Sequence, residues 1–222
     1  MTAAADVAHE LRTPLGGIVA RVEAAQDGVL ETDRALAAIH DEALRLTRLA
    51  EDLARLADAQ RPGLLLDKQH VDLAQIARRQ ASRYAGEFAA KEIAVALDLD
   101  AADVMGDGAR LEQVVDNLLS NALRYTDRGG RVALRVRTGA EEVELEVSDT
   151  GIGIRVEDLP HVFERFWRGE KSRSRATGGA GIGLAIVREL VRAHDGRVDL
   201  DSTRGAGSSF RVWLPSGAGR PP

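Results

Sequence analysis

The stretch GARLEQVVDNLLSNALRYT, residues 108–126, predicts a single amphipathic helix that organises the second part of the chain. Its apolar residues recur at spacings of three and four, so they form one wide stripe that has to be buried against another layer. Asn117 and Asn121 are four residues apart and therefore lie one above the other at the edge of this stripe. Arg124 and Tyr125 follow a turn later on the same flank. A single Asn there would most often be a surface amide, but two amides beside a cation and an aromatic ring suggest a site for Mg²⁺ and phosphate.

Strand and helix patterns alternate on both sides of this helix. Before it, the sequence predicts the end of a strand followed by a helix at 71–92, and then a strand at 93–100. After it, the sequence predicts two strands at 131–138 and 141–149, a helix at 182–196 and a closing hairpin of strands at 197–203 and 207–215. Consecutive strand pairs look antiparallel, so we expect an α+β two-layer sandwich rather than a doubly wound parallel sheet.

The first 60 residues have a different composition, with almost no Gly or aromatic residues and much Ala, Leu, Arg and Glu. Apolar residues there alternate spacings of three and four in two series, Val7, Leu11, Leu15, Ile18, Val22, Val29 and then Leu36, Ile39, Ala43, Leu46, Ala50, Leu53, Ala57. Gly28 and a possible N-cap at Thr32 or Asp33 separate the two series, which predicts an α-helical hairpin. Two helices alone cannot bury stripes this wide, so we expect a homodimeric four-helix bundle.

Composition excludes several classes of protein. The formal charge is -5 and basic residues are not gathered into a patch, which argues against nucleic-acid binding. The chain has no Cys, so disulfides and thiolate metal sites are excluded. No apolar run approaches the roughly 18 residues of a membrane span, and the N-terminus lacks a signal-peptide pattern. We therefore expect the chain as given to be soluble and intracellular, without membrane contact.

Two Gly-rich stretches could approach a ligand closely. SDTGIGI, residues 148–154, follows a strand, and its Asp149 is an acceptor suited to an exocyclic amine, although a lone DTG would be no more than a capped turn. GGAGIGLAIVREL, residues 178–190, places backbone N–H groups before a helix, where they suit an anion, although alone it could be a flexible loop. The preceding segment is polar and basic rather than a strand, which favours a phosphate-binding lid over a dinucleotide-binding turn.

The order and spacing of these motifs are more specific than any one of them. NLLSNALRYT, DTGIGI, FERFWRG, GGAGIGL and the weaker GAGSSF resemble the N, G1, F, G2 and G3 boxes of the sensor histidine kinases of two-component systems, and VAHELRTPL (7–15) resembles their H box. The resemblance covers residues 6–215. It departs from the common pattern at Ala180 and Ile182, at Ser208, where Thr is usual and a hydroxyl is kept, and at Ala3, where Phe is common. Full-length members of the family carry more helix before this point and often membrane spans, so the resemblance implies the cytoplasmic part of a membrane-anchored bacterial sensor or an unusually short soluble kinase.

The resemblance implies roles for the H box. His9 would be the phosphoacceptor, Glu10 a general base that accepts the second ring proton, and Thr13 a residue that helps water attack the phosphorylated regulator. Independently of the resemblance, Val7 and Leu11 point into the helical seam and leave His9 about 200° away, towards solvent. The other four histidines, His40, His70, His161 and His194, lack this context, and we interpret them as surface or helix-end residues.

The resemblance also implies an ATP-binding fold shared with DNA gyrase and the large heat-shock chaperones. Asn121 would ligate Mg²⁺ with help from Asn117, and Asp149 would take the adenine amino group. The remaining nucleotide contacts would come from Arg124, Tyr125, Gly151, Gly153, Arg165, Lys171, Gly179, Gly181, Gly183 and Leu184, with Arg173 and Arg175 also near the triphosphate in a lid over 170–180. This assignment gives a helical hairpin at 1–60 for dimerisation and phosphotransfer, a linker at 61–69, an ATP-binding catalytic domain at 70–216 and a disordered tail at 217–222.

The expected activity is that of an ATP-dependent protein-histidine kinase, which autophosphorylates His9 and transfers the phosphoryl group to an aspartate in the receiver domain of a response regulator. Two alternatives remain: a net phosphatase of that regulator, and a dimeric helical adaptor whose bound ATP only sets its conformation.

Overall fold

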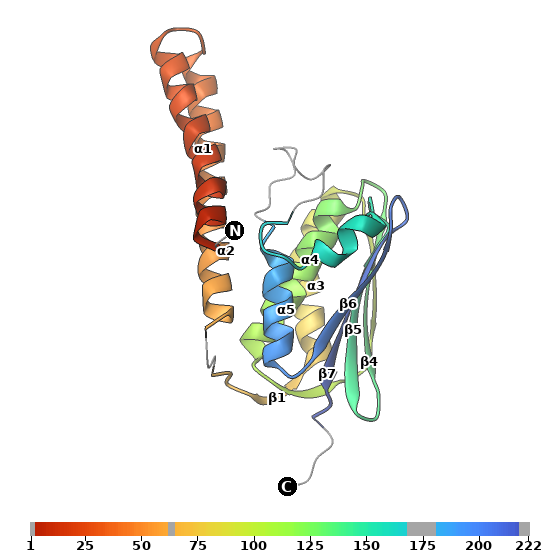
Figure 1. Ribbon diagram of the computed structural model, residues 1–222. Helices are drawn as coiled ribbons and strands as arrows, with labels where there is room; N and C mark the ends of the chain where they lie inside the picture. Colours follow the sequence, from red (N-terminus) through yellow and green to blue (C-terminus); the bar gives the residue numbers. More distant parts are fainter. Residues whose placement is uncertain (1–2, 62–64, 168–180, 218–222) are drawn as a thin grey trace.

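The computed structural model describes residues 3–61, 65–167 and 181–217, and for residues 3–6, 9 and 10 it describes the backbone alone. The helices are α1 (Ala3–Gln26), α2 (Thr32–Ala59), α3 (Leu73–Ala90), α4 (Gly108–Tyr125), the 3₁₀ helix η1 (Val156–His161) and α5 (Gly183–Ala193). The strands are β1 (Gln69–Asp72), β2 (Ala94–Leu99), β3 (Asp103–Gly106), β4 (Arg131–Thr138), β5 (Glu142–Asp149), β6 (Arg197–Thr203) and β7 (Gly207–Pro215). A helical hairpin thus precedes an α+β sandwich, as expected (Figure 1). None of the helices in these ranges is both long and apolar enough to cross a membrane.

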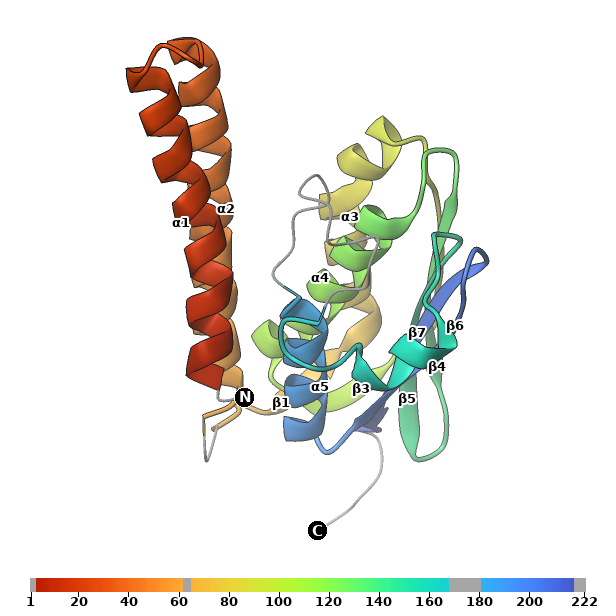
Figure 2. The ribbon, with the colours of Figure 1, turned by 45° about the horizontal axis from the view of Figure 1, so that its top comes forward.

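The hairpin consists of α1 and α2, which pack side by side along their length (Figures 1 and 2). The chain reverses at Gly28, whose φ of 68° lies in the left-handed region that Gly adopts most readily. The N-cap prediction was wrong: α2 already begins at Thr32, and Glu31 occupies the N-cap position without a side-chain hydrogen bond.

Much of the apolar surface of the hairpin is not covered within one chain. Leu15 is 51% exposed, Val19 54% and Leu36 59%. At the other end of α2, Leu49 and Leu56 are buried in the same hydrophobic cluster as the sandwich. The hairpin is therefore docked on the sandwich through one end of α2 and keeps an open apolar stripe elsewhere.

The sandwich has a five-stranded sheet in the order β2-β4-β5-β7-β6. The pairs β4–β5 and β6–β7 are antiparallel, as expected, and β5–β7 is antiparallel too. The edge strand β2, however, pairs parallel to β4, because α4 lies between them in sequence and returns the chain to the same end of the sheet. A second sheet, β1 with β3, was not anticipated.

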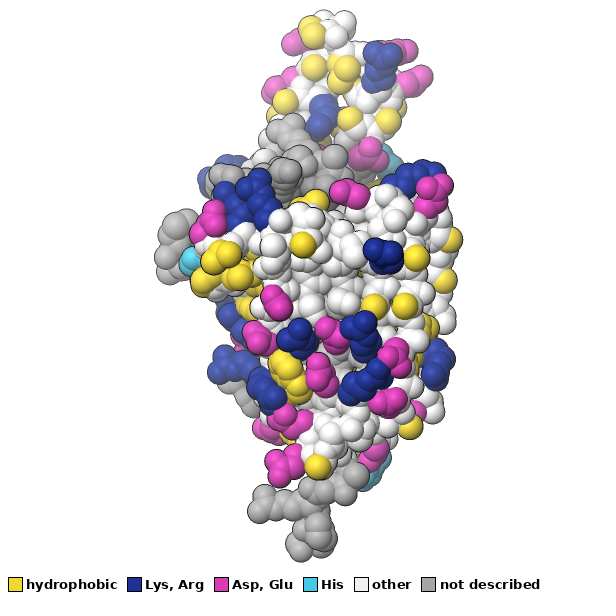
Figure 3. Space-filling view, turned by 90° about the vertical axis from the view of Figure 1, so that its right-hand side faces the viewer, with side chains coloured by type: hydrophobic (Ala, Val, Ile, Leu, Met, Phe, Trp, Pro, Cys, Tyr) yellow, Lys and Arg dark blue, Asp and Glu magenta, His cyan; other side chains and the backbone are white. Residues whose placement is uncertain are grey.

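The two faces of the large sheet differ. Helices α3, α4 and α5 cover one face (Figures 1 and 2), where the apolar side of α4 is buried at Leu111, Val114, Val115, Leu118, Leu119 and Ala122. This is the stripe that the 108–126 pattern predicted. The other face carries interleaved acidic and basic side chains (Figure 3), for example Arg135 paired with Glu146 at 2.8 Å and Arg197 paired with Glu142. The sandwich therefore has one core, between the helices and the sheet.

His194 is a helix-end residue, as the sequence suggested, because it is the C-cap of α5, but it is buried rather than on the surface. It is 2% exposed, its Nδ1 donates to the carbonyl of Leu190 at 2.8 Å, and its Nε2 accepts from the backbone N–H of Asp107 at 3.0 Å. Burial lowers the pKa of the His194 imidazole. A neutral ring has one donor and one acceptor, and both are used here to tie the end of α5 to the N-terminus of α4.

Candidate functional site

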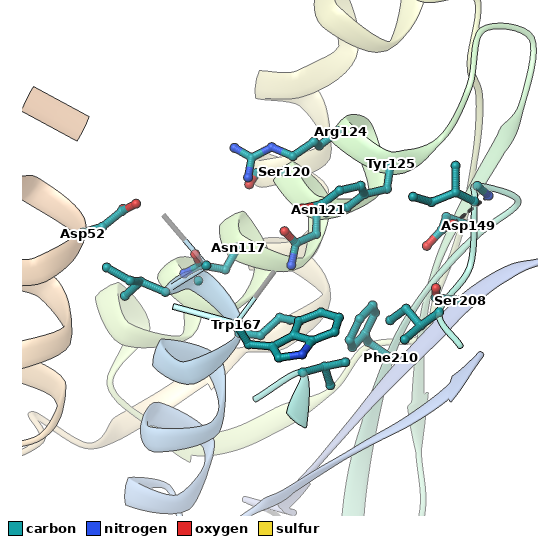
Figure 4. Close-up of a pocket in the computed structure, with 18 of the residues that line it drawn as sticks. Asp52, Asn117, Ser120, Asn121, Arg124, Tyr125, Asp149, Trp167, Ser208 and Phe210 are labelled. Atoms are coloured by element: carbon teal, nitrogen blue, oxygen red, sulfur yellow. Dashed lines mark hydrogen bonds between the residues drawn. The ribbon is translucent and has the colours of Figure 1, made fainter. Parts of the chain in front are cut away.

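A cavity of about 640 Å³ lies between the helical layer, the end of the sheet and α2. Figure 4 shows side chains from α4, from the end of β5, from β7 and from α2 that converge on it. Its volume is in the range of small-molecule sites, which usually combine apolar walls with a few placed polar groups.

One wall is the polar edge of α4. Asn117, Asn121, Arg124 and Tyr125, the four residues singled out in the sequence, all line the cavity. Asn117 Nδ2 donates to the carbonyl of Gln113 at 2.8 Å, and a Cβ on Gly183 would lie 2.7 Å from Asn117 Oδ1. The start of α5 therefore packs closely against this amide, and the amide oxygens of α4 are of the type that Mg²⁺ accepts.

Asp149, at the end of β5, lies at the opposite end of the cavity (Figure 4). Its Oδ1 accepts from the backbone N–H of Gly151 at 2.7 Å, and the backbone of Ser208 forms a further hydrogen bond to the carboxylate. Burial raises the pKa of Asp149, and these two hydrogen bonds oppose the shift. The group is a half-buried acceptor that faces a space large enough for a ligand.

The loop that carries Gly151 and Gly153 is fixed by its neighbours. The N–H of Ile152 donates to the carbonyl of Tyr125 at 3.1 Å, and a Cβ on Gly151 would lie 2.3 Å from that carbonyl oxygen. Gly153 has a φ of 59°, and a Cβ there would lie 2.0 Å from the carbonyl oxygen of Thr203. Only glycine allows these two approaches, so the loop lies tightly between α4 and the β6–β7 hairpin.

The start of α5 forms a third side of the cavity. Gly181, Gly183 and Leu184 line it, and Ile182, the N-cap residue of α5, makes no side-chain capping bond. Backbone N–H groups at such a helix start favour an anion. Lys171, Arg173, Arg175 and Gly179 lie outside the described residues. Arg165 is exposed and is not among the described residues that line the cavity.

The H-box segment lies on α1. Thr13 is exposed, and Pro14 beside it is buried and lines the cavity. The side chains of His9 and Glu10 lie outside what the structure describes, although both residues are within α1. The cavity and the H-box helix therefore adjoin at Pro14.

Sequence reasoning missed the part of the cavity that comes from α2. Arg45, Arg48, Asp52 and Arg55 line it, and Figure 4 shows Asp52 extending from α2 towards α4. Burial raises the pKa of Asp52, and the nearby Arg55 and Arg124 guanidinium groups partly offset the shift. No local pattern marks these residues, because a helical period does not tell which domain docks on a helix.

Two aromatic rings were also missed. Trp167 and Phe210 lie side by side at the floor of the cavity (Figure 4). Both belong to stretches quoted for their boxes, FERFWRG and GAGSSF, so their place in those motifs was the available signal. They supply an apolar surface against which a planar ring can pack.

Two family models match the chain. Residues 2–62 match the "His Kinase A (phospho-acceptor) domain", and residues 106–218 match the "Histidine kinase-, DNA gyrase B-, and HSP90-like ATPase". Within the described residues, no group of three or more His, Asp or Glu side chains is arranged to hold a metal ion.

Individual proteins agree with the family models. The signal transduction histidine-protein kinase BaeS of Escherichia coli (strain K12) is 38% identical over 95% of this chain and 46% of its own length. The solved Acinetobacter baumannii histidine kinase AdeS has a TM-score of 0.76 at 26% identity, over 94% of this chain and 98% of that one. Full-length ShkA in complex with AMPPNP has a TM-score of 0.71 at 26% identity, over 98% of this chain and 46% of that one. The chain spans about half the length of the curated relatives it matches.

Proposed function

The chain belongs to the sensor histidine kinases of two-component systems, and on that premise we propose that its cavity binds ATP with Mg²⁺ and that His9 receives the γ-phosphoryl group. The observation that carries the proposal is one cavity with a half-buried acceptor, Asp149, at one end and a helix N-terminus with two amide side chains at the other. An adenine nucleotide has the complementary ends, an exocyclic amine and a triphosphate. The complex of ShkA with AMPPNP, an ATP analogue, supports the assignment.

At the base end, the Asp149 carboxylate would accept the adenine amino group. Its two backbone hydrogen bonds hold it in place, and the Trp167 and Phe210 rings supply a flat apolar surface for the purine. The fixed Gly151 and Gly153 loop keeps this acceptor at one position, so little ordering is left for the moment of binding.

At the phosphate end, Asn121 would ligate Mg²⁺ with help from Asn117, while the backbone at Gly181 and Gly183 would face the phosphates. Arg124 and Tyr125 stand on the same wall and would contact phosphate and nucleotide. Bound Mg²⁺ would neutralise phosphate charge. Phosphoryl transfer depends mainly on positioning and on such charge neutralisation, and these groups supply both.

The acceptor would be His9. A ring nitrogen of its neutral imidazole attacks the γ-phosphorus, the bond from that phosphorus to the ADP oxygen breaks, and Glu10 accepts the proton of the other ring nitrogen. The phosphoryl group then passes to an aspartate carboxylate in the receiver domain of a response regulator. In the opposing phosphatase reaction, Thr13 would orient a water that attacks the phosphorus of the aspartyl phosphate, so that the bond to the aspartate oxygen breaks and inorganic phosphate leaves. The position of Pro14 on the cavity supports an approach of this helix to the nucleotide.

The hairpin would dimerise. The exposed apolar residues Leu15, Val19 and Leu36 form surface that a second copy can cover in a four-helix bundle. This completes the proposed division into a phosphotransfer hairpin at 1–60 and an ATP-binding domain at 70–216.

Incubation with γ-labelled ATP and Mg²⁺ tests the proposal. We expect an acid-labile, alkali-stable label that disappears in His9→Gln, and transfer of the label when the cognate receiver domain is added. His40→Gln, on the surface of α2, is the matched control and should keep the label. Measurable ATP binding without any label would favour the adaptor reading, and removal of phosphate from the regulator much faster than self-labelling would favour the phosphatase.

A further inference from the structure

Ser202 on β6 is a buried hydroxyl that none of the motifs includes. It is 8% exposed, and its side chain joins three segments. The backbone N–H of Ile154 donates to Ser202 Oγ at 2.9 Å, and Ser202 Oγ donates to the carbonyl of Gly207 at 2.9 Å. A third contact, also 2.9 Å, joins Ser202 Oγ to Ser208 Oγ. The loop after β5, strand β6 and the start of β7 therefore meet at this one oxygen.

The hydrogen-bonding capacity of serine gives the last contact a direction. A hydroxyl has one proton and two lone pairs. The carbonyl of Gly207 can only accept, so it takes the proton of Ser202. The N–H of Ile154 takes one lone pair, and the second lone pair is left for Ser208. The contact between the two hydroxyls is then satisfied only when Ser208 donates and Ser202 accepts.

This direction matters because Ser208 lines the cavity. Ser208 is the register partner of Asp149 across β5 and β7, and the two lie next to each other at one end of the cavity (Figure 4). With its proton directed at Ser202, Ser208 Oγ offers only lone pairs to a ligand. The base end of the cavity then presents two acceptors, the Asp149 carboxylate and the Ser208 hydroxyl oxygen.

We propose that Ser202 is a positioning residue that sets the base specificity of the nucleotide site by holding Ser208 as a hydrogen-bond acceptor. The inference rests on the proposed ATP site. Adenine carries an amino group at C6 and can donate to such acceptors, directly or through a water. Hypoxanthine and guanine carry a carbonyl at C6, which needs a donor. A site built for one polar group discriminates strongly against a ligand that leaves its own groups unpaired.

The test is the ratio of the Kd of IDP to the Kd of ADP, measured by isothermal titration calorimetry with Mg²⁺. In Ser202→Ala the Ser208 proton becomes free to turn towards a C6 carbonyl. We expect the ratio to fall by about 3- to 10-fold, as for one hydrogen bond. In a Ser208→Ala background, adding Ser202→Ala should leave the ratio unchanged, because the group it orients is gone. Equal weakening of ADP and IDP by Ser202→Ala, with the ratio kept, would leave Ser202 a structural residue and overturn the proposal.

Two further variants control for packing. Ser202→Thr keeps the hydroxyl and should keep the ratio. Ser209→Ala removes a neighbouring hydroxyl that faces the other side of β7, where it donates to Glu146 at 2.6 Å, and should also keep the ratio. A fall of the ratio in Ser209→Ala comparable to that in Ser202→Ala would contradict the proposal.

The proton direction can also be read without any substitution, in case Ser202→Ala does not fold. Neutron diffraction from deuterated crystals of the wild-type chain should show the Ser208 deuterium pointing at Ser202 Oγ, and a deuterium pointing into the cavity would overturn the proposal. If the wild-type chain binds neither nucleotide, the proposed function fails. If it prefers ADP but Ser202→Ala keeps that preference, the inference about Ser202 alone fails.

Discussion

Neighbouring backbone groups influence the protonation of the Asp149 side chain. Burial alone would favour its protonated form, and the hydrogen bonds from the backbone of Gly151 and Ser208 favour the carboxylate. The residue could be singled out from the sequence because it ends a strand ahead of a Gly-rich turn. The Ser208 contact could not be predicted, because Ser208 lies 59 positions after Asp149 and the two residues meet only through the pairing of β5 with β7.

Replacing Asp149 tests its role as an acceptor. Asp149→Asn keeps the size of the side chain but places an NH₂ group where the adenine amine is expected, so two donors would face each other. A hydrogen bond to a charged group contributes about 1.5–3 kcal/mol, so we expect ADP affinity to fall by at least about 10-fold. Calorimetric titration measures this. Asp201→Asn, on exposed β6, is the control, and an equal loss there would show that the effect is not local to the cavity.

The glycine at position 153 should be far less replaceable than another glycine in a similar conformation. Gly153→Ala adds a Cβ 2.0 Å from the Thr203 carbonyl oxygen, whereas Gly129, with a φ of 79°, has nothing within 4 Å of its Cβ position. Gly129→Ala should cost about 1–2 kcal/mol of unfolding free energy from the left-handed backbone alone. Gly153→Ala should cost more and should also weaken ADP binding. Denaturant titration and calorimetry check both, and equal costs would contradict the packing described for this loop.

At the scale of elements, helical periodicity and strand alternation together predicted most of the helices and strands. The α4 stripe, the α3 and α5 helices and the two hairpins of the large sheet follow from local patterns. The small β1–β3 sheet did not, because each strand is four residues long and its pairing is set by the distant partner. The parallel β2–β4 pairing was not predicted either. It follows from the position of α4 in the chain between the two strands, and the sequence of neither strand indicates it.

The buried His194 joins two elements and makes their docking depend on pH. Its pKa is lowered in the folded state, so the unfolded chain binds more protons in the mildly acidic range. The stability that neutral His194 contributes is complete above its unfolded pKa near ~6.5 and is lost as the pH falls towards the folded value. We expect the free energy of unfolding to decrease between about pH 7 and pH 5. In His194→Gln this slope should be shallower, whereas in His40→Gln, on the surface of α2, it should be unchanged.

At the scale of the whole molecule, the hairpin docks on the sandwich and shares its cavity. Leu49 and Leu56 are buried there, and Asp58 of α2 forms an ion pair with Arg110 of α4. The sequence predicted both parts but not this contact, because each part has its own apolar pattern and neither pattern indicates the other. The residues of α2 that line the cavity, Asp52 among them, were missed for that reason.

The remaining apolar surface of the hairpin gives a prediction about assembly. Leu36→Glu places a charge in the open stripe of α2, where we expect a second copy to pack, and should shift the chain towards monomer in sedimentation velocity. Asp41→Lys also changes a charge on α2 but lies about 140° round the helix from Leu36, and should leave the dimer intact. A Leu36→Glu chain that stays dimeric at micromolar concentration would rule out this seam.

The shared cavity has a consequence for inhibitors. A compound that filled it would contact α2 as well as α4, and so would stabilise the docking of the hairpin on the sandwich. Because such coupling is reciprocal, its affinity would rise or fall with whatever moves the hairpin, and its binding would in turn hold the hairpin still. Compounds that extend from the purine position towards Asp52 and Arg55 would therefore be selective for the conformation in which the hairpin is docked on the sandwich. A compound confined to the nucleotide pocket would not have this selectivity.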